Sequence, residues 1–174
     1  MSAVLVVESY FGSTHHLAEI VAATLHESGI AASVVDVDLA TESLPDGTEL
    51  LVVGAPTHER GLSTPESRQA ATNLTTHGPA RTGVREWASE LALPEHPPLV
   101  AVFDTRMGDP WMAGSAAAQA SVLLSGRGFP VSPARITFRV IDVAGPLREG
   151  EVERARHWAA DLAARLAHRQ RTHQ

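Results

Sequence analysis

The chain alternates between short apolar runs and longer segments in which apolar residues recur at helical spacing. The short runs lie at residues 4–8, 32–37, 50–53 and 99–103, with a fifth, interrupted by a proline, inside 131–141. The helical patterns lie at residues 14–28, 84–91, 114–127 and 151–168. Runs of this length, rich in β-branched residues, are typical of strands. We therefore predict an α/β fold in which five parallel strands are covered by helices on both faces.

Ligands of such folds bind at one end of the sheet. In an open parallel sheet the binding crevice lies outside the carboxyl ends of the strands, where the strand order reverses. The polar loops after the first, third and fourth apolar runs should therefore meet at one edge. We expect these three loops to form the functional site.

The loop after the first run has the composition of an anion site. Residues 9–14 read Ser-Tyr-Phe-Gly-Ser-Thr, and the helical pattern follows directly. The first N–H groups of a helix have no intrahelical partner and sit at the positive end of its dipole, and the Ser and Thr hydroxyls add donors. The segment predicts a phosphate site. A plain turn with Ser13 or Thr14 as the helix N-cap has the same composition and stays open as an alternative.

The other two loops combine turn residues with groups that could touch a ligand. Residues 54–61 read Gly-Ala-Pro-Thr-His-Glu-Arg-Gly, and the glycine and proline suit a tight exit from a strand. Residues 104–115 contain a Gly108-Asp109 pair followed by Trp111. An indole is a large apolar group, so Trp111 could equally pack on the surface of the protein itself.

Together the three loops resemble those of flavodoxin-like proteins, which bind FMN. The resemblance implies a flavodoxin-like three-layer α/β/α sandwich with a five-stranded parallel sheet in the order 2-1-3-4-5. In the first loop it implies that the FMN phosphate is wrapped by Ser9, Tyr10, Phe11, Gly12, Ser13 and Thr14. In the second it implies that the isoalloxazine ring is edged by Pro56, Thr57 and His58. In the third it implies contacts to the pyrimidine edge and the ring face from Thr105, Arg106, Gly108, Asp109 and Trp111.

Three further segments are similar to a group of flavodoxin-like proteins of high-GC bacteria. They are residues 82–87, 103–106 and 145–151. From the pattern alone, the helix around 84–91 has Trp87 facing inward and residues 145–150 form a turn before the last helix. We interpret these segments as parts of the scaffold.

Composition excludes several other function classes. The 174 residues include no cysteine, which excludes disulfides, a thiolate nucleophile and Fe–S ligation. All 14 basic residues are arginine, so a Walker lysine, a Schiff-base lysine and the active-site lysine of receiver domains are absent. The net charge of −6 argues against nucleic-acid binding. We expect a cytoplasmic protein without membrane segments, with one domain over residues 1–168 and a polar tail at 169–174.

Charged residues in the loops bear on flavin chemistry. Arg60 and Arg106 lie in the two loops assigned to the ring, and Arg68 follows shortly after. A guanidinium near the ring would favour an anionic reduced flavin, whereas outward arginines would be solvated or paired with nearby carboxylates. No metal site is predicted, because the adjacent His15 and His16 point in different directions on a helix. No residue is assigned as catalytic.

Three functions agree with the sequence. The first is an FMN-binding redox protein that transfers electrons to a protein partner. The second is an FMN-dependent, quinone-type oxidoreductase acting on a small molecule, in which His58 could move protons. The third is an interaction module that has lost its flavin. Residues 59–83 are longer than a simple crossover and could roof a substrate pocket or form a structural helix at 65–73.

Overall fold

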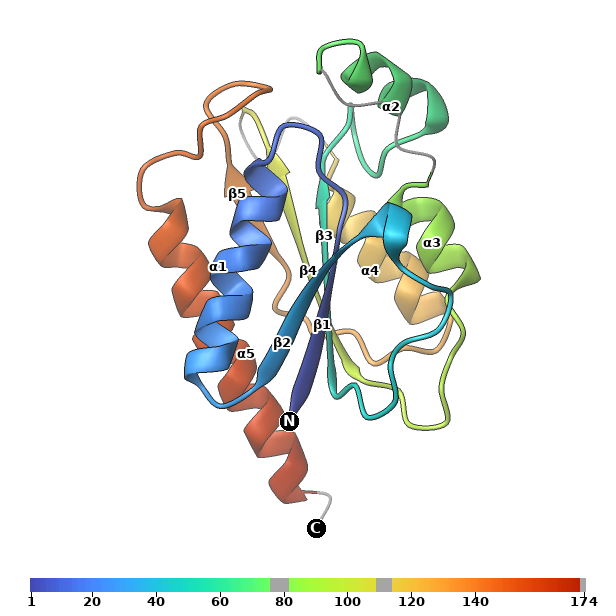
Figure 1. The fold of residues 1–174 in the computed structure, drawn as a ribbon, viewed down its shortest axis with the longest axis vertical. Helices are drawn as coiled ribbons and strands as arrows, with labels where there is room; N and C mark the ends of the chain where they lie inside the picture. Colours follow the sequence, from blue (N-terminus) through green and yellow to red (C-terminus); the bar gives the residue numbers. More distant parts are fainter. Residues whose placement is uncertain (76–81, 109–113, 173–174) are drawn as a thin grey trace.

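A computed structural model describes residues 1–75, 82–108 and 114–172. One parallel sheet lies between two layers of helices (Figure 1). Across the sheet the strands are β2 (Ala31–Asp36), β1 (Ser2–Val7), β3 (Leu50–Pro56), β4 (Leu99–Arg106) and β5 (Ile136–Arg139). Every neighbouring pair is parallel. The predicted sandwich and its strand order 2-1-3-4-5 are confirmed.

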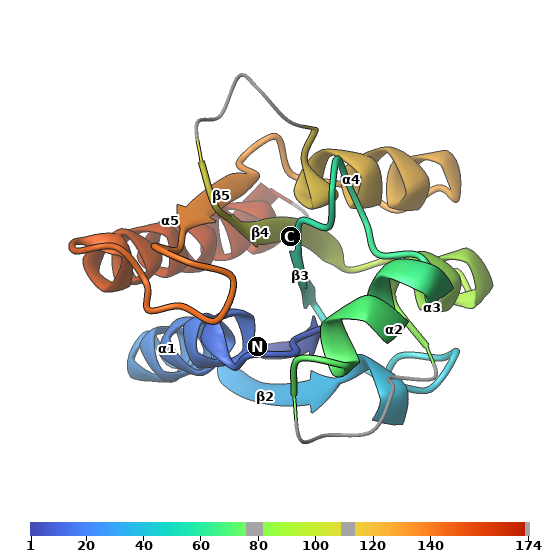
Figure 2. The same cartoon turned by 90° about the horizontal axis from the view of Figure 1, so that it is seen from above.

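Helices cover both faces of the sheet (Figure 2). On one face lie α1 (Ser13–Glu27) and α5 (Glu151–Thr172), and on the other α3 (Val84–Glu90) and α4 (Ala116–Gly126). A short 3-10 turn, η1 (Val37–Leu39), follows β2. No helix within the described ranges is both long and apolar enough to cross a membrane.

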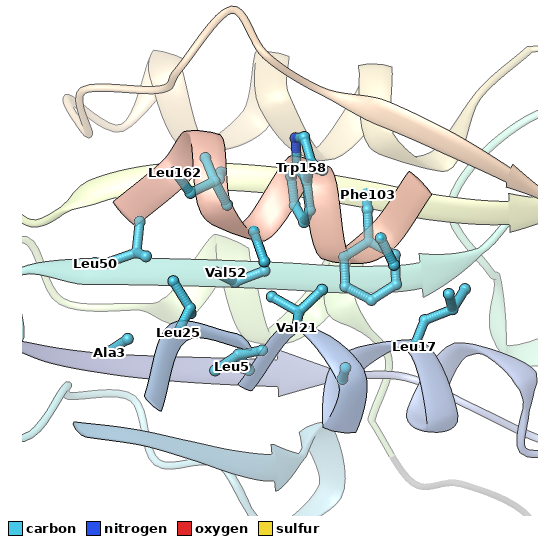
Figure 3. Packing of buried hydrophobic residues seen from close by; sticks show 14 of the residues in the cluster. Ala3, Leu5, Leu17, Val21, Leu25, Leu50, Val52, Phe103, Trp158 and Leu162 are labelled. Atoms are coloured by element: carbon cyan, nitrogen blue, oxygen red, sulfur yellow. The ribbon is translucent and has the colours of Figure 1, made fainter. Parts of the chain in front are cut away.

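The core is built from the alternation of side chains along the central strands. In β1, Leu5 faces the layer of α1 and α5, whereas Val4 and Val6 face the layer of α3 and α4. Both sets are buried, so the strand reads as a continuous apolar run rather than as an alternating one. Figure 3 shows Phe103 on the first of these faces, and its ring meets the Trp158 ring edge-on at a centroid distance of 5.9 Å.

The third and fourth strands run further than the sequence predicts. The β3–β4 ladder continues through Pro56 and Thr105, and Arg106 still pairs with Arg139 of β5. The segment 104–106, which we expected in a loop, is therefore strand. The reason is tertiary, because these polar residues keep an extended backbone through pairing with neighbours on both sides.

Two other boundaries also differ. The fifth strand is confined to Ile136–Arg139, and Val131 makes only an isolated bridge to Val100. A proline cannot donate to the ladder, so Pro133 accounts for the late start. At the other end of the chain α5 continues to Thr172, so residues 169–172, which we expected in a polar tail, are helical.

One helix lies at the end of the sheet rather than on a face. Figure 1 shows α2 (Pro65–Thr72) beyond the ends of the strands, above α3. Its start is fixed by a capping box in which the Thr64 and Ser67 side chains each accept a hydrogen bond from the backbone N–H of the other. The segment 59–83 thus contributes a helix close to the predicted 65–73, placed where it borders the functional edge.

Candidate functional site

A cleft of about 440 Å³ opens at the carboxyl ends of the strands, where the three predicted loops meet. It lies between the start of α1, the end of β4, α2 and the loop after β5. The residues that line it are Ser9, Tyr10, Phe11, Ser13, Thr14, Pro56, Thr57, His58, Glu59, Ser67, Ala70, Ala71, Leu74, Thr105, Arg106, Met107, Val140 and Val143. Its size and mixed lining are those of a small-molecule site.

The loop between β1 and α1 presents an open helix N-terminus to this cleft. Gly12 occupies the N-cap position with φ of 91° and supplies no side-chain cap. Only glycine adopts this conformation without a steric penalty. The Gly12 carbonyl accepts the first intrahelical hydrogen bond of α1, from the His16 N–H at 2.9 Å. The Ser9 hydroxyl accepts the His15 N–H at 3.4 Å. The N–H groups of Ser13 and Thr14 are therefore the backbone donors that the first turn of α1 offers to a ligand, together with the Ser13 hydroxyl.

A hydroxyl pair joins the first loop to the end of β4. The Thr14 and Thr105 side-chain oxygens lie 2.8 Å apart, and both residues are buried. Two hydroxyl groups share one hydrogen bond, so one of the two protons remains available to a further acceptor. The pair can therefore still donate to an anion in the cleft while holding the two loops together.

A buried carboxylate organises the end of β4 and the start of α4. Asp104 is fully buried, and its Oδ2 accepts hydrogen bonds from the Thr57 hydroxyl, the Ser115 hydroxyl and the Ala117 N–H. Thr57 in turn accepts from the Ala116 N–H. This arrangement caps α4 with a negative charge at its N-terminus, which is favourable for the helix dipole. It also turns the Thr57 hydroxyl toward α4, although the residue lines the cleft.

A second buried carboxylate lies under the first loop. Glu8 is 1% exposed. One of its oxygens accepts from the Tyr10 hydroxyl at 2.7 Å and the other from the Val84 N–H at 2.8 Å. Burial and the neighbouring Glu8 carboxylate raise the pKa of Tyr10 above its ordinary range. The phenol thus stays protonated. Tyr10 lines the cleft, but its hydroxyl is hydrogen-bonded to Glu8.

An arginine close to Glu8 is buried too. Arg68 is 2% exposed, lies 3.1 Å from Glu86 in an ion pair, and donates to the Ser63 hydroxyl at 3.0 Å. In the sequence Arg68 follows shortly after the loops assigned to the flavin ring, but it does not line the cleft. The guanidinium points into the protein, where it pairs with a carboxylate of α3.

His58 stands beside Tyr10 in the wall of the cleft. The two rings lie 5.2 Å apart, and His58 Nδ1 lies 3.0 Å from the Ser67 hydroxyl oxygen. Burial lowers the pKa of His58 below its ordinary 6.5; Glu8 opposes the shift and Arg68 adds to it. The imidazole is therefore neutral at neutral pH, with one nitrogen held by α2.

The two loop arginines differ in exposure. Arg106 is buried and donates to the Gly114 carbonyl at 3.2 Å, so of the two placements left open by the sequence, the solvated one does not hold for it. Arg60 is exposed in the turn that follows His58. Only Arg106 lines the cleft. Among the described residues, no three His, Asp or Glu side chains gather as they would around a metal ion.

We compared the sequence and the structure with those of known proteins. No family model matches the sequence, and no curated protein is significantly similar to it. Among solved structures, flavodoxin 1 from Bacillus cereus superposes with a TM-score of 0.66 at 18% identity, covering 92% of this chain and 96% of that one. A flavodoxin from Archaea gives 0.63 at 14% identity, covering 96% and 99%. The chain has the flavodoxin-like fold.

The same fold occurs within a larger protein. Rubredoxin oxygen:oxidoreductase from Desulfovibrio gigas matches with a TM-score of 0.62 at 15% identity, and the alignment covers 95% of this chain but 36% of that one. The flavodoxin-like fold therefore serves both as a separate chain and as part of a longer one. At these identities the likeness concerns the fold.

Within this flavodoxin-like fold, most of the predicted site residues meet in one place. Ten line the cleft: Ser9, Tyr10, Phe11, Ser13, Thr14, Pro56, Thr57, His58, Thr105 and Arg106. Gly12 lies in the turn just behind them and borders a neighbouring hollow with Asp36. Gly108 is exposed beyond the cleft, where its carbonyl accepts a hydrogen bond from Arg139. Asp109 and Trp111 lie outside the described residues.

The sequence analysis missed two groups of residues. Glu8 and Arg68 were not recognised as a buried polar cluster, since their partners Val84 and Glu86 lie far along the chain. Val140 and Val143 line the cleft, although Val140 was assigned to the fifth apolar run and Val143 was given no role. A glutamate directly after an apolar strand is a weak signal for the first group. Nothing in the local sequence marks the second.

Proposed function

We propose that this protein binds FMN in the cleft and transfers electrons to a protein partner. The observation that carries the proposal is the N-terminus of α1, which has a glycine without a side-chain cap at its N-cap position. The Ser13 hydroxyl and the Thr14–Thr105 pair line the same cleft at the carboxyl edge of the sheet. Backbone N–H groups and hydroxyls at a helix N-terminus are suited to a phosphate monoester. The flavodoxin-like fold supports the same assignment.

The residues present fit this cofactor. Glu8, directly before the phosphate loop, does not line the cleft, and its two oxygens accept hydrogen bonds from the Tyr10 hydroxyl and the Val84 N–H. Glu59 lines the cleft after His58, in the loop assigned to the ring rather than to the phosphate. Tyr10, His58 and Arg106 line the cleft and would hold the ring. When bound, FMN would supply one- and two-electron transfer. The stacking role of Trp111 stays a prediction, as do a cytoplasmic location and the likeness to high-GC bacterial proteins.

A flavin titration tests the proposal. Purified protein is mixed with FMN, riboflavin or FAD, and the dissociation constants are measured from flavin absorption and fluorescence. We expect FMN to bind most tightly, because the loop recognises a terminal phosphate. The S13A/T14A double variant should weaken FMN by about 2 kcal/mol or more, the usual value of hydrogen bonds to a charged group. An unchanged FMN constant in that variant would contradict the phosphate assignment.

One observation favours a second function, an FMN-dependent oxidoreductase acting on a small quinone-like molecule. His58 is a neutral imidazole in the wall of the cleft, with its Nδ1 held by Ser67, and is thus placed to exchange a proton with a bound substrate. A chemically reduced, FMN-loaded protein mixed with a water-soluble quinone separates the two functions. Rapid reoxidation that slows in His58→Gln would favour the oxidoreductase. Equal rates in both proteins would favour electron transfer to a protein.

A further inference from the structure

The loop between β5 and α5, residues 140–150, is a compact turn fixed to the end of the sheet. Val140 donates its N–H to the Arg106 carbonyl at 3.1 Å and bridges Leu147 in antiparallel fashion. The Ile141 N–H donates to the Pro146 carbonyl at 2.9 Å, and the Arg148 N–H to the Arg139 carbonyl at 2.8 Å. These bonds close the loop on itself, so its tip has a defined position.

That position is against the phosphate loop. Figure 2 shows the segment after β5 beside the start of α1. Gly145 has φ of 91°, and a Cβ built on it would lie 2.9 Å from the Ser13 hydroxyl oxygen. A side chain at this position would meet both a strained backbone and the hydroxyl that we assign to the phosphate. The close approach of the two loops thus depends on glycine.

The side chains that this loop brings to the cleft are apolar. Val140 and Val143 line it, and Val143 is 52% exposed. The two carboxylates of the loop, Asp142 and Glu149, do not line the cleft, and Asp142 accepts the N–H of Val143 at 2.6 Å. Leu74 after α2 and Met107 after β4 line the same cleft and are also exposed, at 71% and 44%. Exposed apolar side chains gathered around one hollow indicate a surface that a ligand covers.

From this placement we infer that the β5–α5 loop is a fourth cofactor-binding element, in which Val143 covers the ribityl chain and ring edge of FMN and Gly145 lets the loop reach Ser13. This inference rests on the proposed function. The apolar contact by Val143 is independent of the phosphate and acts on any flavin. The approach at Gly145 affects the phosphate end and acts on FMN alone.

Two variants on the loop and one matched control test the inference through dissociation constants of FMN and riboflavin. Val143→Ser should weaken both flavins about three- to tenfold, as expected for the loss of part of a valine's burial. Gly145→Ala should weaken FMN more than riboflavin. Ile141→Ser is the control, because Ile141 lies on the same loop, is 60% exposed and does not line the cleft, so both constants should stay at the parent values.

The outcomes distinguish the role of the β5–α5 loop from the proposal that the protein binds FMN. If the parent protein does not bind FMN, both fail. If the parent binds FMN and the S13A/T14A variant is weakened, but Val143→Ser and Gly145→Ala match Ile141→Ser, only the role of the loop is overturned. Thermal unfolding of each apoprotein shows whether a weakened variant is still folded.

Discussion

Two segments that line the cleft are held in different ways. The first, residues 57–74, includes α2 and is called the inner wall here; side chains of α3 and α4 bind it to the rest of the protein. Arg85 of α3 donates to the Leu62 carbonyl at 2.8 Å, and Gln119 of α4 accepts the Leu62 N–H at 3.0 Å. The outer wall, residues 140–150, is held mainly by backbone hydrogen bonds within the loop and to the ends of β4 and β5.

This difference indicates a division of roles between the walls. Charges buried under the inner wall fix its geometry, since a buried ion pair that loses one partner leaves an uncompensated charge. Within the part of the chain that the structure describes, no ion pair anchors the outer wall, and the wall presents the exposed Val143 to the cleft. We expect changes in the inner wall to alter folding stability first and ligand binding second. Changes in the outer wall should alter binding with little effect on stability.

The largest effect should come from Arg68→Ala. The substitution removes the buried cation and leaves Glu86 without its ion-pair partner beside the buried Glu8. Breaking a pair with both partners buried costs about 3–5 kcal/mol of unfolding free energy, and we expect the lower end of this range because the Glu86 side chain is 35% exposed. Urea denaturation of the apoprotein measures it. The control is Arg156→Ala, which breaks an exposed pair with Glu153 and should cost about 1 kcal/mol or less. Similar losses in both variants would show that Arg68 is not an anchor.

A smaller loss is expected for Tyr10→Phe. The change removes the hydroxyl that donates to the buried Glu8 carboxylate and keeps the ring in the wall. Hydrogen bonds to charged groups contribute about 1.5–3 kcal/mol, and this loss should appear in the same denaturation assay. Ser121→Ala, which removes a hydroxyl bonded to a neutral backbone carbonyl, should cost less. FMN affinity should change little in Tyr10→Phe. A large loss of FMN binding with unchanged stability would place the hydroxyl on the ligand instead.

The smallest effect on folding stability should come from the titration of His58. The pKa of His58 is lowered in the folded protein, so below its ordinary value of 6.5 the unfolded chain binds a proton that the folded protein does not. Stability should therefore fall as the pH drops from 6.5 toward the folded pKa. His58→Gln should lack this part of the pH dependence. Denaturation between pH 7.5 and about 5 compares the two proteins. Parallel curves would mean that His58 titrates normally, and NMR titration of its imidazole would then give an ordinary pKa.

The sequence by itself determined the fold and the composition of the phosphate loop. Five apolar runs separated by helical patterns define a doubly wound sheet, because period and length are local properties of the chain. The glycine and hydroxyl residues of 9–14 indicate an anion site for the same reason, since the donors and the helix start lie within six residues. The convergence of three loops then followed from the rule that parallel strands present their carboxyl ends at one edge.

The tertiary structure alone decided what surrounds that loop. Glu8 is buried because the Val84 N–H, 76 positions away, and the Tyr10 hydroxyl satisfy it. Arg68 turns inward because α3 brings Glu86 to it. Val143 reaches the cleft because the last strand ends beside α1, where Gly145 allows the loop to approach Ser13. Each outcome depends on a partner from a distant segment, and the cost of burying a polar group without that partner cannot be read from local sequence.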